Sequence, residues 1–184
     1  MRIRDLPQSD GPLIQQAAQV LCDAFKQDWP NAWPTLADAL AEVHEFFAAD
    51  RLARVAVADD GTLLGWIGGL ETYNGNVWEL HPLAVSPIWQ GQGIGRALVA
   101  DLEAQVAARG ATTLYLGTDD ENGMTSLAGV DLYPNVWAHI EHLRNLRRHP
   151  YEFYQKLGFS IVGVLPDANG PGKPDILMAK RVRS

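Results

Sequence analysis

The stretch Val77–Arg96, VWELHPLAVSPIWQGQGIGR, decides how the rest of the chain is interpreted. Its first nine residues predict a buried strand, with Glu79 and His81 two residues apart on one face. An apolar repeat typical of a helix ends the stretch. Glycines stand at alternate positions before that repeat: Gly91, Gly93 and Gly95. Backbone N–H groups in such a turn, at the positive end of a helix dipole, predict an anion site beside the polar strand.

Length and composition indicate one globular domain over residues 1–184. The chain is 47% hydrophobic, and its formal net charge is −7. An acidic chain is a poor nucleic-acid ligand, although its charge can attract a cationic substrate. Cys22 is the single cysteine, which excludes disulfide frameworks and thiolate metal clusters. With no apolar run of about eighteen residues and no signal peptide, the sequence predicts a cytoplasmic protein without a membrane partner.

The order of the elements predicts a mixed α/β fold with one strand–helix–strand crossover. Asp10 or Ser9 is predicted to begin a first helix and Thr35 a second. The inner stripe of the second helix is predicted as Leu36, Leu40, Val43 and Phe47. Strands are expected at 2–5, from residue 54, and at 63–70, 77–85, 112–117, 159–165 and 175–181. Further helices are expected from Ile94 to Arg109, near 136–143 and at 151–157.

The glycine turn is neither a Walker loop nor a full dinucleotide fingerprint, because its spacing is G-x-G-x-G and it lacks the terminal Gly-Lys-Ser/Thr. It suits a pyrophosphate that is held rather than broken, as in coenzyme A. The alternative is a plain strand-to-helix turn. Three alternate glycines beside the polar residues Gln90, Gln92 and Arg96 favour the phosphate site.

Pro82 is the second indication of a ligand site. A proline in a central strand cannot donate to the ladder, so the sheet is expected to come apart near Pro82, between this strand and the one at 112–117. The backbone groups of Leu83, Ala84 and Val85 would then be free. An extended amide-bearing ligand such as the pantetheine arm of coenzyme A could pair with them as an added strand.

Two motifs carry a family resemblance. Gln90-x-x-Gly93-x-Gly95 after Leu83–Val85, and Phe153-Tyr154-x-x-Leu157-Gly158-Phe159, resemble the acetyl-CoA-dependent GNAT N-acetyltransferases. More narrowly, residues 78–180 look like bacterial aminoglycoside 6′-N-acetyltransferases. The resemblance implies a mostly antiparallel sheet that is splayed at Pro82 and flanked by helices. Three positions depart from the superfamily pattern: Gln90 replaces the usual arginine, and Arg147 and Pro150 replace an asparagine and a small residue.

The resemblance also implies direct attack of an amine on acetyl-CoA, without an acyl-enzyme. Glu79, directly or through water, or His81 could take the proton of the amine. The Leu83 N–H could stabilise the oxyanion, and Tyr154 could supply or share a proton with the leaving thiolate. The residues expected at the coenzyme are Leu83, Ala84, Val85, Gln90, Gly91, Gln92, Gly93, Ile94, Gly95, Arg96 and Tyr154.

For the amine substrate, Glu79, Asp119 and Asp120 are expected to pair with ammonium groups, and Trp29 and Tyr73 to stack on a sugar ring. A solvated turn for the two aspartates and ordinary packing for the two aromatic residues are the open alternatives. The histidines have no convergent spacing, so no metal is expected. Two other functions stay open: acetylation of another amine, such as a polyamine, a protein N-terminus or a lysine, and a non-catalytic acyl-CoA sensor. A homodimer is expected by analogy.

Overall fold

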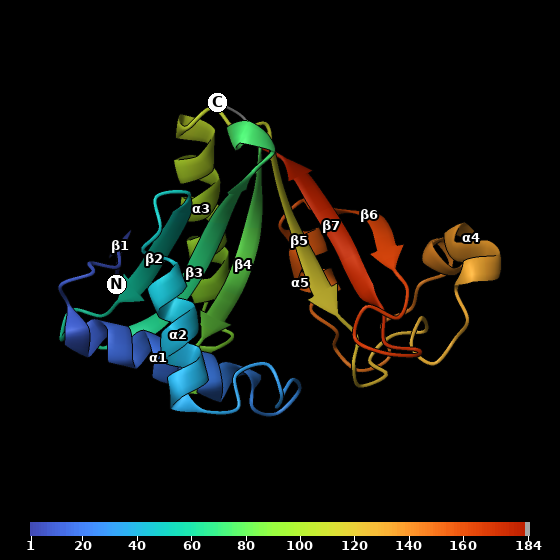
Figure 1. The fold of residues 1–184 in the computed structure, drawn as a ribbon, viewed down its shortest axis with the longest axis horizontal. Helices are drawn as coiled ribbons and strands as arrows, with labels where there is room; N and C mark the ends of the chain where they lie inside the picture. Colours follow the sequence, from blue (N-terminus) through green and yellow to red (C-terminus); the bar gives the residue numbers. More distant parts are fainter. Residues whose placement is uncertain (183–184) are drawn as a thin grey trace. The chain divides into compact units, whose positions relative to one another are not determined.

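The computed structural model describes residues 1–182 (Figure 1). It contains two compact units, Met1–Leu114 together with Val182, and Tyr115–Arg181. Both units combine strands with helices, which confirms the mixed α/β class. The expectation of one domain over residues 1–184, and that of a sheet splayed at Pro82, stay predictions. No helix in the described part of the chain is both long and apolar enough to cross a membrane.

The first unit is built on four antiparallel strands in the order β1-β2-β3-β4. The strands are β1 (Arg2–Asp5), β2 (Arg51–Val57), β3 (Leu63–Thr72) and β4 (Val77–Val85). The helices are α1 (Gly11–Phe25), α2 (Leu36–Glu45) and α3 (Ile94–Ala108), with the short 3-10 turns η1 (Tyr73–Gly75) and η2 (Pro87–Trp89). The predicted central strand agrees with β4 at both ends.

Local side-chain chemistry starts the first two helices as predicted. The Asp10 carboxylate accepts the Leu13 N–H at 3.1 Å, and Thr35 and Asp38 form a reciprocal capping box. The predicted stripe of α2 is wrong in part, because Leu36 is 40% exposed. The buried side chains of this segment are Ala39, Val43 and Phe46.

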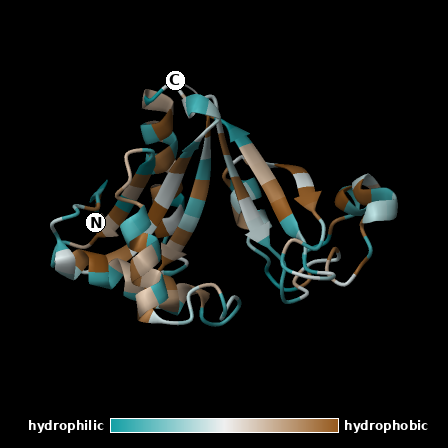
Figure 2. Cartoon of the chain, viewed as in Figure 1, coloured by the Kyte–Doolittle hydropathy of each residue, from teal (hydrophilic) through white to brown (hydrophobic). Residues whose placement is uncertain are grey.

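The two faces of this sheet can be told apart at two adjacent glycines of β3. A side chain at Gly68 would meet Phe46, which directly follows α2, whereas one at Gly69 would meet Leu102 of α3. Adjacent residues of a strand point to opposite faces, so α2 and α3 cover different faces. Hydrophobic stretches recur along α1, β2 and β3 in Figure 2, where the core of the α1–α2 face lies.

Arg54 crosses from the sheet to α3 and is 8% exposed. Its Nε donates to Asp101 Oδ2 at 2.6 Å and its Nη2 to Asp101 Oδ1 at 3.1 Å, while Nη1 pairs with Asp5. This bidentate pair satisfies a buried cation and ties β1, β2 and α3 together. On the same helix the predicted apolar repeat is confirmed, because every member is buried: Ile94, Leu98, Leu102 and Val106.

The second unit has three strands in the order β5-β7-β6. They are β5 (Thr113–Asp119), which starts in the first unit, β6 (Ser160–Leu165) and β7 (Asp175–Arg181), and β6 and β7 are antiparallel. The helices are α4 (Val136–Glu141) and α5 (Tyr151–Lys156), with the 3-10 turn η3 (Tyr133–Asn135).

The chain leaves the first unit and returns to it at neighbouring positions. Thr112 and Thr113 donate their N–H groups to the Asn76 carbonyl at 2.9 and 3.3 Å, and this part of the first unit ends at Leu114. After the second unit, the Val182 N–H donates to the Thr112 carbonyl at 3.0 Å. The outgoing and returning segments are therefore one hydrogen bond apart.

Candidate active site

A bulge divides β4 directly after the polar pair that the sequence predicted. The register skips one residue on β3 and two on β4, so His81 and Pro82 lie together opposite Gly68. The extra residue shifts the alternation by one position. As a result His81, the first residue of the bulge, and Ala84 after it both face the α1–α2 side. Glu79 is half-buried and lies on the same face of the strand as His81, as predicted.

Gly68 is the residue that makes room for this bulge. A Cβ at this position would lie closer than 3.0 Å to both the His81 carbonyl oxygen and the Phe46 ring. A backbone carbonyl cannot move away as the end of a flexible side chain can. Glycine is therefore required where the bulged strand comes closest to β3.

The imidazole of His81 has a partner that sequence reasoning did not identify. Its Nε2 lies 3.5 Å from Glu42 Oε1, and the other carboxylate oxygen of Glu42 accepts the Trp33 Nε1–H at 3.4 Å. The hydrogen bond with His81 is the main cause that lowers the pKa of Glu42. An available signal was that Glu42 directly precedes the buried Val43 on α2, where an acid on the sheet-facing side of a helix needs a partner.

The glycine turn leads into α3 as predicted. Gly91 and Gly93 have φ values of 74° and 87°, and an added Cβ at either position would meet no atom within 4 Å. Gly93 is the N-cap of α3, and no side chain caps the first N–H groups of this helix. These N–H groups and the helix dipole form a positive, sterically open end.

The side chains around this turn differ in what they can offer a ligand. Gln92 and Arg96 are exposed, whereas the Ile94 side chain is buried in the core and leaves only its backbone for binding. The Gln90 amide donates to the Val85 carbonyl at 3.2 Å. The Gln90 side chain, which was predicted to contact phosphate, therefore binds the Val85 carbonyl, which was predicted to be free.

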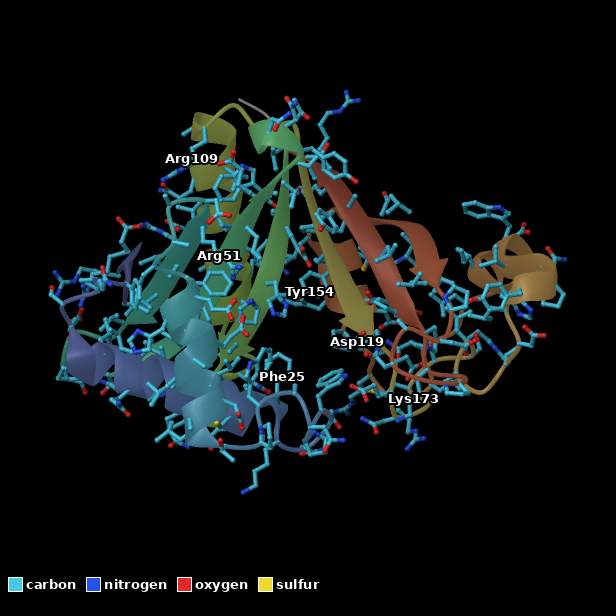
Figure 3. All side chains as sticks on the ribbon, in the orientation of Figure 1. Phe25, Arg51, Arg109, Asp119, Tyr154 and Lys173 are labelled. Atoms are coloured by element: carbon cyan, nitrogen blue, oxygen red, sulfur yellow. The ribbon has the colours of Figure 1, made fainter. Side chains whose placement is uncertain are left out.

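Tyr154 lies in the second unit, on α5 (Figure 3). Its ring is buried and packs edge-on against Phe153 and Phe159, with ring centroids 5.1 and 5.7 Å away. Burial raises the pKa of Tyr154 above its ordinary value of about 10. The phenol therefore stays protonated at neutral pH and acts as a hydrogen-bond donor.

Asp119 and Asp120, at the end of β5, have separate environments. Asp120 is fully buried, and its two carboxylate oxygens each accept a backbone N–H at 2.7 Å, from Met124 and Thr125. The prediction that Asp120 pairs with an ammonium group of a substrate is therefore wrong, because this carboxylate folds the following loop. Asp119 is half-buried, and its Oδ1 accepts the Asn169 amide at 2.5 Å.

His149 connects the end of β5 with the start of α5 and was not predicted to contribute. It is 1% exposed, its Nε2 lies 3.1 Å from the Asp119 carbonyl oxygen, and its Nδ1 accepts the Tyr151 N–H at 3.2 Å. Because Nδ1 is an acceptor, Nε2 carries the proton of a neutral ring. Burial lowers the pKa of His149, which agrees with this neutral form.

The two aromatic residues predicted to contact a sugar lie apart along the first unit. Trp29 is half-buried and its ring centroid lies 5.7 Å from that of Phe25, at the C-terminal end of α1 (Figure 3). Tyr73 is 76% exposed in η1, the turn between β3 and β4. Trp33 was not predicted, although its ring centroid lies 5.9 Å from that of His81.

Taken one by one, these groups suit the transfer of an acyl group to an amine. The first unit carries a helix terminus suited to phosphate, a bulged strand, and a carboxylate–imidazole pair. The second unit carries a protonated phenol and a half-buried carboxylate. Within residues 1–182, no group of three or more His, Cys, Asp or Glu side chains is arranged to hold a metal ion.

Known proteins resemble this chain both in sequence and in structure. Residues 18–127 match the acetyltransferase (GNAT) family. An aminoglycoside N(6′)-acetyltransferase type 1 of Stenotrophomonas maltophilia is 31% identical over 144 residues, which cover 73% of this chain and 84% of that protein.

Two crystal structures are similar to the whole chain. One is an aminoglycoside 6′-N-acetyltransferase complexed with coenzyme A, with 41% identity and a TM-score of 0.90. The other is an aminoglycoside 6′-N-acetyltransferase from Enterococcus faecium, with 41% identity and a TM-score of 0.88. Each covers 100% of this chain and 98% of its own.

Proposed function

Because the chain belongs to the acetyltransferase (GNAT) family, we propose that it transfers the acetyl group of acetyl-CoA to the 6′-amino group of aminoglycosides. The observation that carries the proposal is the likeness, over the full chain, to an aminoglycoside 6′-N-acetyltransferase crystallised with coenzyme A. An activity of this kind would confer resistance to the antibiotic.

The first unit fits the coenzyme at two places. The start of α3 would hold the pyrophosphate through the N–H groups of Gly93, Ile94 and Gly95, because no side chain competes for them. The left-handed glycines and the open space around them support this role. The backbone of Leu83 and Ala84 would hold the pantetheine arm, and the Val85 carbonyl would join them once Gln90 releases it.

The reaction forms one bond and breaks one. The amine nitrogen bonds to the thioester carbonyl carbon, the carbon–sulfur bond breaks, and the amine loses a proton while the thiolate needs one. Glu79 or His81 takes the proton of the amine, and the Leu83 N–H stabilises the oxyanion. Tyr154 would donate a hydrogen bond to the leaving thiolate without losing its proton, because burial raises its pKa, and the thiolate takes its proton from water after release.

Binding of a polycationic substrate is favoured by carboxylates and by the net charge of −7. Asp119, whose Oδ1 accepts the Asn169 amide, would contribute a carboxylate from the end of β5. Glu79 would contribute from β4. Trp29 and Tyr73 are proposed to contact the sugar rings, and a homodimer is proposed by analogy with relatives.

The experiment compares neomycin with paromomycin, which carry an amine and a hydroxyl, respectively, at the 6′ position. Coenzyme A release is followed with a thiol reagent after acetyl-CoA is added. Turnover with neomycin and none with paromomycin is expected. Equal turnover with both would place the acetyl group at another position. No turnover with any aminoglycoside, combined with acetylation of spermidine or a peptide, would replace the proposal with the broader one of another amine substrate.

A further inference from the structure

Glu42 approaches His81 in a way that sets the chemistry of the imidazole. The two atoms concerned are Glu42 Oε1 and His81 Nε2, 3.5 Å apart. An ionised carboxylate can only accept hydrogen bonds, so Nε2 must carry the proton when the two pair. The remaining ring nitrogen, Nδ1, is then an acceptor.

The carboxylate is itself fixed rather than mobile. Its second oxygen accepts the Trp33 indole N–H at 3.4 Å, and the Trp33 ring lies against His81 with centroids 5.9 Å apart. The Glu42 side chain is 20% exposed, compared with 44% for His81. A sheltered acid therefore holds one edge of a ring that is itself more exposed.

We propose that Glu42 is a positioning residue: it holds His81 by Nε2 and so keeps Nδ1 as the acceptor for the proton of the substrate amine. This inference rests on the proposed function and selects His81, rather than Glu79, as the base. Arg51 on β2 also acts on Glu42, and Glu79 lies on the same face of β4 as His81.

The decisive variant is Glu42→Gln, which keeps the shape and removes the charge. A glutamine amide can donate to Nε2, and the ring then carries its proton on Nδ1, where it cannot accept one. We expect kcat to fall on the order of 10²-fold while the KM for acetyl-CoA stays unchanged.

The matched control is Glu45→Gln, one turn along α2. Glu45 pairs with Arg51 at 3.1 Å, and its side chain is 60% exposed. Its removal changes the charge of the same helix by the same amount without touching His81, so kcat should stay as in the unchanged protein. In a His81→Gln background, Glu42→Gln should cause no further loss of kcat.

A second readout does not depend on turnover. Nitrogen-15 NMR of the histidine rings reports the tautomer of His81, and Glu42→Gln is expected to move the ring proton from Nε2 to Nδ1 whereas Glu45→Gln leaves the tautomer unchanged. The same His81 tautomer in both variants would overturn the proposal. A rise in the KM for the aminoglycoside with unchanged kcat would also overturn it, because Glu42 would then bind substrate. An inactive protein that still shows the NMR effect would refute the proposed function alone.

Discussion

Replacing Gly68 by alanine tests whether one glycine fixes the bulge of β4. The new methyl group would lie closer than 3.0 Å to the His81 carbonyl oxygen and to the Phe46 ring at the same time. Overpacking of this kind costs about 1–3 kcal/mol, and two obstructions, one of them backbone, place Gly68→Ala at the upper end. The reduced freedom of the unfolded chain offsets about 0.5 kcal/mol.

The expected net loss in the free energy of unfolding is therefore about 2 kcal/mol, or roughly 4–8 °C in Tm for a chain of this size. Because the displaced carbonyl belongs to His81, we also expect kcat/KM to fall by about tenfold or more in the folded variant, since small misplacements of reacting groups are costly. Urea unfolding and the coenzyme A release assay measure the two effects.

Gly69→Ala is the matched control. The one close contact of its methyl group is the end of the Leu102 side chain, 2.9 Å away on the other face, which can turn aside, and the Trp78 ring lies at an ordinary contact distance of 3.4 Å. We expect a change within about 1 kcal/mol and nearly full activity. The double variant Gly68→Ala/Phe46→Leu removes the ring overlap and should recover part of the stability but not the activity. If Gly68→Ala is as stable and as active as Gly69→Ala, the bulge does not depend on this glycine.

Three further predictions concern single residues. Arg54→Ala leaves the partly buried Asp101 without its cation and should lower the free energy of unfolding by about 2–3 kcal/mol in urea, with a change below 0.5 kcal/mol counting against the pair. Burial lowers the pKa of His149, so the unfolded chain binds an extra proton below about pH 6.5 and stability falls as the pH drops. Between about pH 7 and 5, the Tm of His149→Gln should fall less than the Tm of the unchanged protein. An equal fall in both would exclude His149 as the source of the pH dependence. Tyr154→Phe keeps the ring packing and should reduce kcat by roughly 10–100-fold with little change in Tm, whereas an unchanged kcat would remove Tyr154 from the chemistry.

Local signals in the sequence were sufficient for much of the fold. The apolar repeat of α3 and the limits of β4 depend on neighbours in the chain, and both agree with the structure. The stripe of α2 was misjudged at Leu36, because the first turn of a helix can project beyond the sheet it covers. A period of 3.6 residues fixes which positions align but not how far the partner surface extends.

The candidate site was less accessible to sequence reasoning, because its contacts join distant segments. The pairing of His81 with Glu42 depends on how α2 lies on the sheet, and neither residue carries a local signal for the other. Asp120 was misassigned because a buried carboxylate that accepts two backbone N–H groups looks, in sequence, like a solvated acid in a turn. The role of Gly68 also depends on distant segments, because the His81 carbonyl and the Phe46 ring lie where its side chain would be.

The adjacent exit and return of the chain make the second unit an insertion in the topological sense. Because Thr112 and Val182 are joined by a hydrogen bond, a linker of a few residues could bridge the first unit without the segment between them. The first unit would keep its strand order and its hydrophobic core, while Tyr154 and Asp119 would be lost together. Recombination could therefore exchange Tyr154 and Asp119 together as one segment, leaving the glycine turn before α3 and the bulged strand β4 unchanged.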